Sequence, residues 1–153
     1  MLPKTTYRVA NATAHEINER IRREILHSVA GCAADGAAAI QRRLDELDAE
    51  WDTERMLEAN ASALVLAGLG LGASVDRKFY LLSAVVASFL LQHALQGWCP
   101  PLPVLRRLGV RTQAEIEMER YALKALRGDF RETEKITGET GAGIREVMQA
   151  VQR

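Results

Sequence analysis

The stretch that decides the fold runs from Ala59 to Cys99 and reads ANASALVLAGLGLGASV, then DRK, then FYLLSAVVASFLLQHALQGWC. Its only charged residues, Asp76 to Lys78, divide it into an apolar run of 17 residues and one of 21. As helices these runs reach about 26 Å and about 32 Å, close to the thickness of about 30 Å of a bilayer's hydrocarbon core. Both are apolar or small on every face, as in a helix surrounded by lipid or protein. The stretch therefore predicts a helical hairpin.

Two surroundings fit such a hairpin, and the sequence favours the membrane. The alternative is a soluble helical bundle that buries the hairpin under the flanking helices, since shorter apolar runs are often core helices. Polar residues near the ends of the runs shorten their purely apolar parts: Asn60, Ser62, Gln92, His93 and Gln96.

Small residues recur four positions apart in both runs, which lets two helix backbones approach closely. Gly68 and Gly72 form a G-x-x-x-G pattern in the first run. In the second run Ala84 and Ser88 repeat the spacing, as do Ser83 and Ala87. We expect these faces to pack against other helices.

Net charge is zero for the whole chain, with 20 basic and 20 acidic residues, so the excess of positive charge that nonspecific nucleic-acid binding needs is absent. The charge is unevenly placed, however: residues 1–58 carry 8 basic and 11 acidic groups, 59–99 carry 2 and 1, and 100–153 carry 10 and 8. We therefore divide the chain into an amphipathic helical region, an apolar hairpin, and a turn followed by amphipathic helices, and predict no nucleic-acid partner.

The front segment has the period of amphipathic helices. A first helix is expected over residues 14–30, ended by Gly31, and Asp35 is a candidate N-cap for the next helix. No helix breaker follows, so one long helix from about residue 36 to 72 is expected. Its apolar stripe has heptad-like spacing and predicts a contact between copies of the chain: Ile40, Leu44, Leu47 and Trp51. The acidic residues around the stripe are read as a solvated helix face.

After the hairpin, the prolines at 100, 101 and 103 end the helix. Trp98 fits an anchor at a membrane interface, and Arg106, Arg107 and Arg111 place both termini in the cytoplasm by the positive-inside rule. A capping box, Thr112 to Glu115, predicts another helix that ends near Gly128. A last short helix is expected over about residues 144–151.

No cofactor or metal site is predicted. The glycines at 68, 70 and 72 lack the alternation of strands and helices of a dinucleotide-binding fold, and the three histidines lack metal-ligand spacing with the cysteines. Cys99 is the one candidate reactive thiol, because His93, Arg106 and Arg107 are potential neighbours that favour a thiolate. The alternative is an inert, half-buried thiol.

Residues 54–110 resemble the YgaP-like transmembrane domain family. The shared features are an arginine before the first apolar helix (Arg55), a glycine-rich first helix, a short charged turn, and a closing Gly-x-Cys-Pro followed by Leu-Gly, here Gly97–Pro100 and Leu108–Gly109. The resemblance implies residence in a bacterial inner membrane and self-association through the hairpin. It does not extend to the rhodanese domain of some members, so no sulfurtransferase activity is implied.

The leading hypothesis is a non-enzymatic, all-α inner-membrane protein that acts as a self-associating scaffold or anchor. A soluble all-α homo-oligomer with the hairpin in a shared core is the first alternative. A thiol redox or sulfur-relay protein acting through Cys99 is the second.

Overall fold

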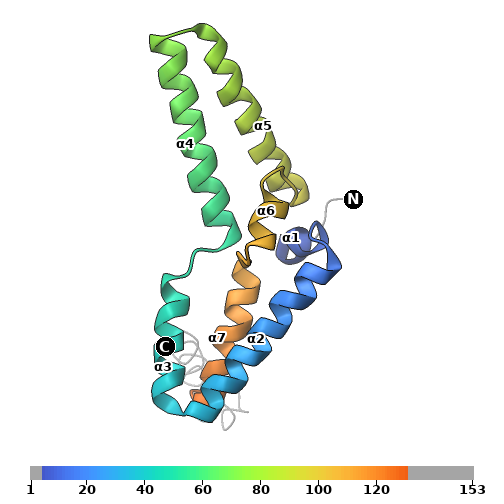
Figure 1. The fold of residues 1–153 in the computed structure, drawn as a ribbon, viewed down its shortest axis with the longest axis vertical. Helices are drawn as coiled ribbons and strands as arrows, with labels where there is room; N and C mark the ends of the chain where they lie inside the picture. The colour runs from blue at the N-terminus through green and yellow to red at the C-terminus, as the bar shows by residue number, and fades with distance from the viewer. Residues whose placement is uncertain (1–4, 131–153) are drawn as a thin grey trace, which may run out of the picture. The chain divides into compact units, whose positions relative to one another are not determined.

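A computed structural model describes residues 5–130, and every regular element in that range is helical (Figure 1). The predicted all-α class is thus confirmed. The elements are the 3-10 turn η1 (Thr5–Tyr7), α1 (Arg8–Asn11), α2 (His15–Asp35), α3 (Ala37–Ala49), α4 (Thr53–Ser74), the 3-10 turn η2 (Arg77–Phe79), α5 (Tyr80–Gln96), α6 (Leu102–Arg107) and α7 (Gln113–Arg127). The expected helix at 144–151 lies outside the described residues.

The described chain forms two compact units. The first, which we call the hairpin unit, contains the residues up to Arg23 and Trp51–Ile116. The second, the flanking unit, contains Glu24–Glu50 and the described residues from Glu117 onward. Helices α2 and α7 contribute residues to both.

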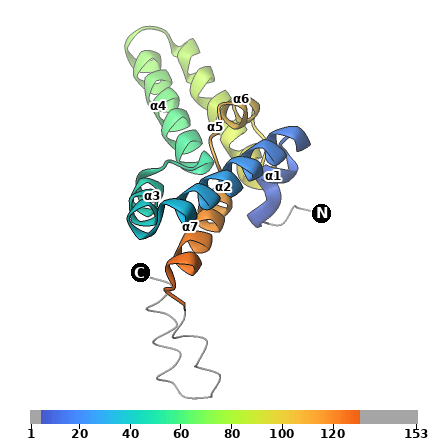
Figure 2. The same ribbon diagram turned by 60° about the horizontal axis from the view of Figure 1, so that its bottom comes forward.

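The predicted hairpin is present: α4 and α5 run antiparallel side by side (Figures 1 and 2). Its turn lies at the three charged residues, as expected. Asp76 caps the turn, because its side chain accepts a hydrogen bond of 2.8 Å from the backbone N–H of Lys78. A short capped turn leaves almost the full length of both apolar runs in the two helices.

Close packing of the two hairpin helices depends on Gly68 and Gly72, both buried on the face of α4 toward α5. A Cβ atom at Gly68 would lie 2.4 Å from Ser83 Oγ. That hydroxyl donates to the carbonyl oxygen of Val65 at 2.9 Å, so the contact is also hydrogen-bonded. A Cβ atom at Gly72 would lie 2.6 Å from the ring of Tyr80. The glycine face therefore packs within one chain.

Of the two pairs of small residues predicted in α5, Ala84 and Ser88 do not take part in this contact, whereas Ser83 of the other pair does. Ala84 and Ser88 are both exposed, and Ser88 Oγ donates to the carbonyl oxygen of Ala84 in its own helix at 2.8 Å. The face of α5 that meets α4 is instead marked by Ser83, which is buried.

Substituting alanine at two neighbouring glycines tests the hairpin contact. Gly68→Ala is expected to lower the free energy of unfolding by about 1–3 kcal/mol, because the added methyl overlaps Ser83. Gly70→Ala is the matched control: nothing lies within 4 Å of its Cβ position, so it should stabilise the helix by up to about 1 kcal/mol. Thermal unfolding in mild detergent, followed by circular dichroism, measures both. Equal shifts in the same direction would contradict the packing described.

The single long helix expected from about 36 to 72 is wrong. Helix α3 ends at Ala49 and α4 begins at Thr53, with Glu50 in extended backbone between them. The Asp52 side chain accepts a hydrogen bond of 2.7 Å from the backbone N–H of Arg55 and so caps α4. The segment between the two helices contains no glycine or proline. Its only local signal is Asp52, because aspartate often caps the start of a helix.

The boundary expected at Gly31 is also wrong. Helix α2 continues through Gly31 to Asp35, and Gly36 occupies the N-cap position of α3 that we expected for Asp35. Gly36 has φ +87°, a left-handed conformation that favours glycine. The chain therefore reverses at the second glycine rather than the first.

The apolar stripe of α3 is buried within the flanking unit. Ile40, Leu44 and Leu47 are all buried, as are Ile25 of α2 and Leu123 of α7. The oligomer contact expected for this stripe is therefore corrected: one chain already covers it. Trp51, in the hairpin unit, remains 45% exposed, with the guanidinium of Arg55 4.2 Å from its ring centre.

Candidate functional site

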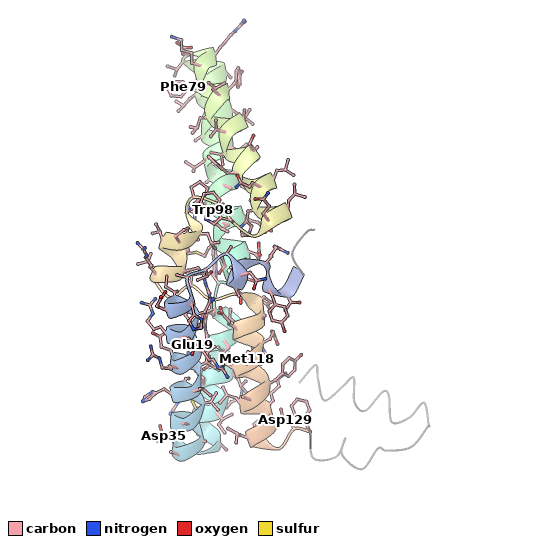
Figure 3. All side chains as sticks on the ribbon, turned by 90° about the vertical axis from the view of Figure 1, so that its right-hand side faces the viewer. Glu19, Asp35, Phe79, Trp98, Met118 and Asp129 are labelled. Carbon is pink, nitrogen blue, oxygen red and sulfur yellow. The ribbon has the colours of Figure 1, made fainter. Side chains whose placement is uncertain are left out.

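The outer surface of the hairpin is apolar and uncovered. In the span Arg77–Gln96 only 11% of the most apolar window is buried, and in the span that ends at Ser74 only 17%. Both are long and apolar enough to cross a membrane. Figure 3 shows side chains projecting along the hairpin between Phe79 at its turn and Trp98 at its foot. The exposed apolar residues include Leu64, Leu66, Leu69, Leu71, Leu81, Leu82, Val85, Phe89 and Leu91.

At the foot of the hairpin, three elements bring together a polar cluster within an apolar core. Arg8 of α1 donates from Nη2 to Glu54 Oε1 of α4 at 2.8 Å. His93 of α5 lies with Nε2 2.9 Å from Glu54 Oε2. Cys99, just beyond α5, interacts with the His93 ring. His93 is 2% exposed and Cys99 3% exposed, so these two side chains are shielded from water, whereas Arg8 and Glu54 are partly exposed.

The contacts of His93 assign a role to each ring nitrogen. An ionised carboxylate only accepts hydrogen bonds, so Nε2 carries a hydrogen and donates it to Glu54. Nδ1 is buried and has no hydrogen-bond partner with good geometry in the described part of the chain. It is therefore the nitrogen that can exchange a proton with the neighbouring thiol. A base oriented by a carboxylate through its other nitrogen is the arrangement of nucleophile–histidine–acid triads.

An apolar groove of about 610 Å³ opens beside this cluster, between the lower parts of α4 and α5 and the turn that follows α5. His93 and Cys99 both line it. Most of the other lining side chains are aliphatic or aromatic, among them Leu57, Leu64, Phe89, Leu90 and Leu105. The site thus combines a histidine and a thiol with an apolar groove through which a reactant can reach them.

Gly97 positions the cluster. Its φ of +76° ends α5 in the left-handed conformation, and its N–H donates to the carbonyl oxygen of His93 at 2.7 Å. A Cβ atom here would lie 2.5 Å from backbone atoms of Arg8. The absence of a side chain therefore lets α1 approach closely enough for Arg8 to reach Glu54.

Sequence reasoning placed His93 among the potential neighbours of Cys99 and missed the rest of the cluster. Arg8 and Glu54 are 46 residues apart, and Glu54 and His93 are 39 apart, so no local pattern joins them. Gly97 was the available signal, because a glycine at the end of a helix often has positive φ.

Arg106 does not approach the thiol, because it forms a second buried site in the hairpin unit. Its side chain is fully buried, and Nη1 and Nη2 each donate to one oxygen of Glu115 at 2.7 Å. The remaining N–H groups donate to Val110 O, Asn18 Oδ1 and Thr13 Oγ1. The interfacial position expected for Arg106 is thus corrected: it is the centre of a network that joins α2, α6 and α7.

The other predicted interfacial residues differ among themselves. Arg107 is exposed, whereas Arg111 is buried, and its carbonyl oxygen accepts hydrogen bonds from the N–H and the hydroxyl of Thr53 at 2.8 and 2.9 Å. Trp98 is 39% exposed at the foot of the hairpin, where an interfacial anchor was expected.

The capping box at the start of α7 is confirmed and shares Glu115 with Arg106. The Thr112 N–H donates to Glu115 Oε2 at 2.7 Å, and the Glu115 N–H donates to Thr112 Oγ1 at 3.3 Å. The helix ends at Arg127, before Gly128 with φ +93°, as expected.

Acid is expected to weaken the hairpin unit through Glu115. Burial alone would raise the pKa of its carboxyl, but hydrogen bonds from Arg106 and the Thr112 N–H outweigh burial and hold the pKa below its usual value. A lowered pKa in the folded state means that this stabilisation is complete above the unfolded pKa of about 4.3 and is lost as the pH falls through the folded value. The melting temperature, measured from pH 5 downward, should fall more steeply for the natural chain than for Glu115→Gln. Parallel curves would contradict this assignment.

Among the described residues, no group of three or more His, Cys, Asp or Glu side chains could hold a metal ion. Searches of protein-family models, curated proteins and solved structures found no match to this chain.

Proposed function

We propose that this chain is a membrane protein anchored by the α4–α5 hairpin, which crosses the bilayer twice and carries the flanking unit as a scaffold. The observation that carries the proposal is the low burial of both spans, 11% and 17% of their most apolar windows. A core helix of a soluble protein is mostly buried by its own chain, whereas these helices expose their apolar side chains on most faces.

Two crossings place both ends of the chain on one side of the membrane. The turn carries Arg77 and Lys78 offset by Asp76, whereas the flanks hold the other 18 basic residues. Arg107 and Arg111 follow α5 closely, and the positive-inside rule then favours cytoplasmic termini. The resemblance of residues 54–110 to the YgaP-like transmembrane domain family, which no family model tests, implies a two-helix hairpin in a bacterial inner membrane.

We expect self-association of the scaffold to use a different surface from the one first expected. The stripe of α3 is covered within the chain, and the Gly68 face packs against α5. Ala84 and Ser88 remain as small residues four apart on an exposed face of α5, a spacing that allows close approach of a second transmembrane helix.

Fractionation without detergent tests the anchor. The full-length chain is expected in the membrane pellet, resistant to alkaline carbonate and released by detergent. Leu66→Glu should move protein to the soluble or aggregated fraction, since Leu66 is exposed near the middle of the first apolar run and a charge near a span's centre costs about 3 kcal/mol. Leu26→Glu is the matched control, because Leu26 is also an exposed leucine but lies on α2. Recovery of the natural chain as a monodisperse soluble oligomer would overturn the proposal and favour the soluble alternative.

A further inference from the structure

The burial of Cys99 restricts what can reach its thiol. At 3% exposure, with Val9, Leu57 and Leu102 in the same core cluster, the sulfur is inaccessible to the thiol or disulfide of another protein. The apolar groove is the approach that the structure offers, since Cys99 contributes to its lining. A reactant must therefore be a small molecule with a long apolar part.

The groups around the thiol are those that nucleophilic chemistry at sulfur requires. His93 Nδ1 is a buried nitrogen without a hydrogen-bond partner in the described part of the chain, and Nε2 is held by Glu54; His93 and Cys99 line the same groove. Glu54 is held in turn by Arg8. This order of nucleophile, base and carboxylate suits thiolate attack on an activated carbonyl.

We propose that Cys99 is a nucleophile that accepts a long-chain acyl group from an acyl thioester, with the chain seated in the apolar groove. Acyl thioesters join the two features that the site requires, a long apolar chain and an electrophilic carbonyl at its end. The proposal goes beyond the membrane anchor and does not depend on it.

The step is an exchange of one thioester for another. The Cys99 thiol gives its proton to His93 Nδ1, and the sulfur forms a bond to the carbonyl carbon of the donor. The carbon–sulfur bond to the donor's thiol then breaks, and the leaving thiolate takes the proton from His93. The products are S-acyl Cys99 and a free thiol, and nothing is oxidised or reduced.

The test incubates the full-length protein in detergent micelles with palmitoyl-coenzyme A and follows its intact mass. We expect one hydroxylamine-sensitive acyl group, which peptide mapping assigns to Cys99 and which is absent from Cys99→Ser. Cys32→Ser is the matched control and should react like the natural chain. Because Cys32 is the more exposed cysteine, nonspecific acylation would favour it. Acylation of Cys32 at an equal or greater rate would overturn the proposal.

Three further measurements separate a built site from a merely accessible thiol. His93→Asn should slow acylation by about 10²-fold, the usual effect of losing a general base. Ala61→Trp keeps all the polar groups and fills the groove, so it should slow palmitoylation. Acetyl-coenzyme A should react more slowly than the palmitoyl donor with the natural chain. If His93→Asn retains its helical content and reacts at the natural rate, or if neither chain length nor Ala61→Trp changes the rate, the proposal is wrong.

Discussion

Arg106→Met is expected to lower the free energy of unfolding of the detergent-solubilised protein by about 3–5 kcal/mol. The guanidinium is fully buried, and all its N–H groups are used by Glu115, Val110, Asn18 and Thr13. Methionine fills a similar volume but leaves the carboxylate of Glu115 largely buried without its partner. The loss should therefore exceed that from removing one ordinary hydrogen bond, about 1 kcal/mol.

The neighbouring arginine is the matched control. Arg107→Met should change the free energy of unfolding by less than about 0.5 kcal/mol, because this side chain is exposed. The double variant Arg106→Met with Glu115→Gln should recover part of the loss, since glutamine removes the unpaired charge and keeps the cap of α7. Chemical denaturation followed by circular dichroism measures all three. Equal losses at 106 and 107 would mean that the buried network does not hold the unit together.

Gly97→Ala is expected to destabilise the hairpin unit by about 2–5 kcal/mol. Two costs add: an alanine at φ +76°, and overlap of its Cβ with backbone atoms of Arg8 at 2.5 Å. Backbone cannot rotate out of the way as a flexible side chain can. We expect α1 to move away from α5 to relieve this overlap, and this movement would separate Arg8 from Glu54.

Gly109→Ala separates the two costs. Gly109 also has positive φ, +88°, but nothing lies within 4 Å of its Cβ position. Its substitution should therefore cost only the conformational part, about 1–2 kcal/mol. Thermal unfolding of both variants measures the difference. A Gly109→Ala variant as unstable as Gly97→Ala would show that the close approach of α1 adds nothing.

The sequence predicted those parts of the fold whose signals come from residues close together along the chain. The hairpin was predictable because two long apolar runs meet at consecutive charges, and the start of α7 because a capping box involves residues three apart. The break before α4 was missed because its signal is a single capping aspartate. The absence of glycine and proline from a segment is therefore weak evidence that one helix continues through it.

The polar clusters were beyond sequence reasoning for a geometric reason. Arg106 and Arg107 look equivalent in the sequence, yet consecutive helical residues point about 100° apart, and only one faces Glu115. The cluster at the foot of the hairpin joins segments about 40 residues apart, so it exists only once α1 has packed beside α5. A periodic sequence pattern shows which residues share one face of a helix. Contacts between residues in distant segments can be identified only from the folded structure.

Spin-label accessibility in liposomes tests most directly whether the outer faces of α4 and α5 meet lipid. Labels would be placed at Leu66→Cys, at Leu81→Cys and, for comparison, at Arg22→Cys on α2, each in a Cys32→Ser and Cys99→Ser background. We expect the labels at 66 and 81 to collide with oxygen and to be protected from a water-soluble nickel chelate, with the reverse at 22. Labels at 66 and 81 that the chelate reaches, or that are shielded from both reagents as in a protein core, would contradict the membrane hairpin.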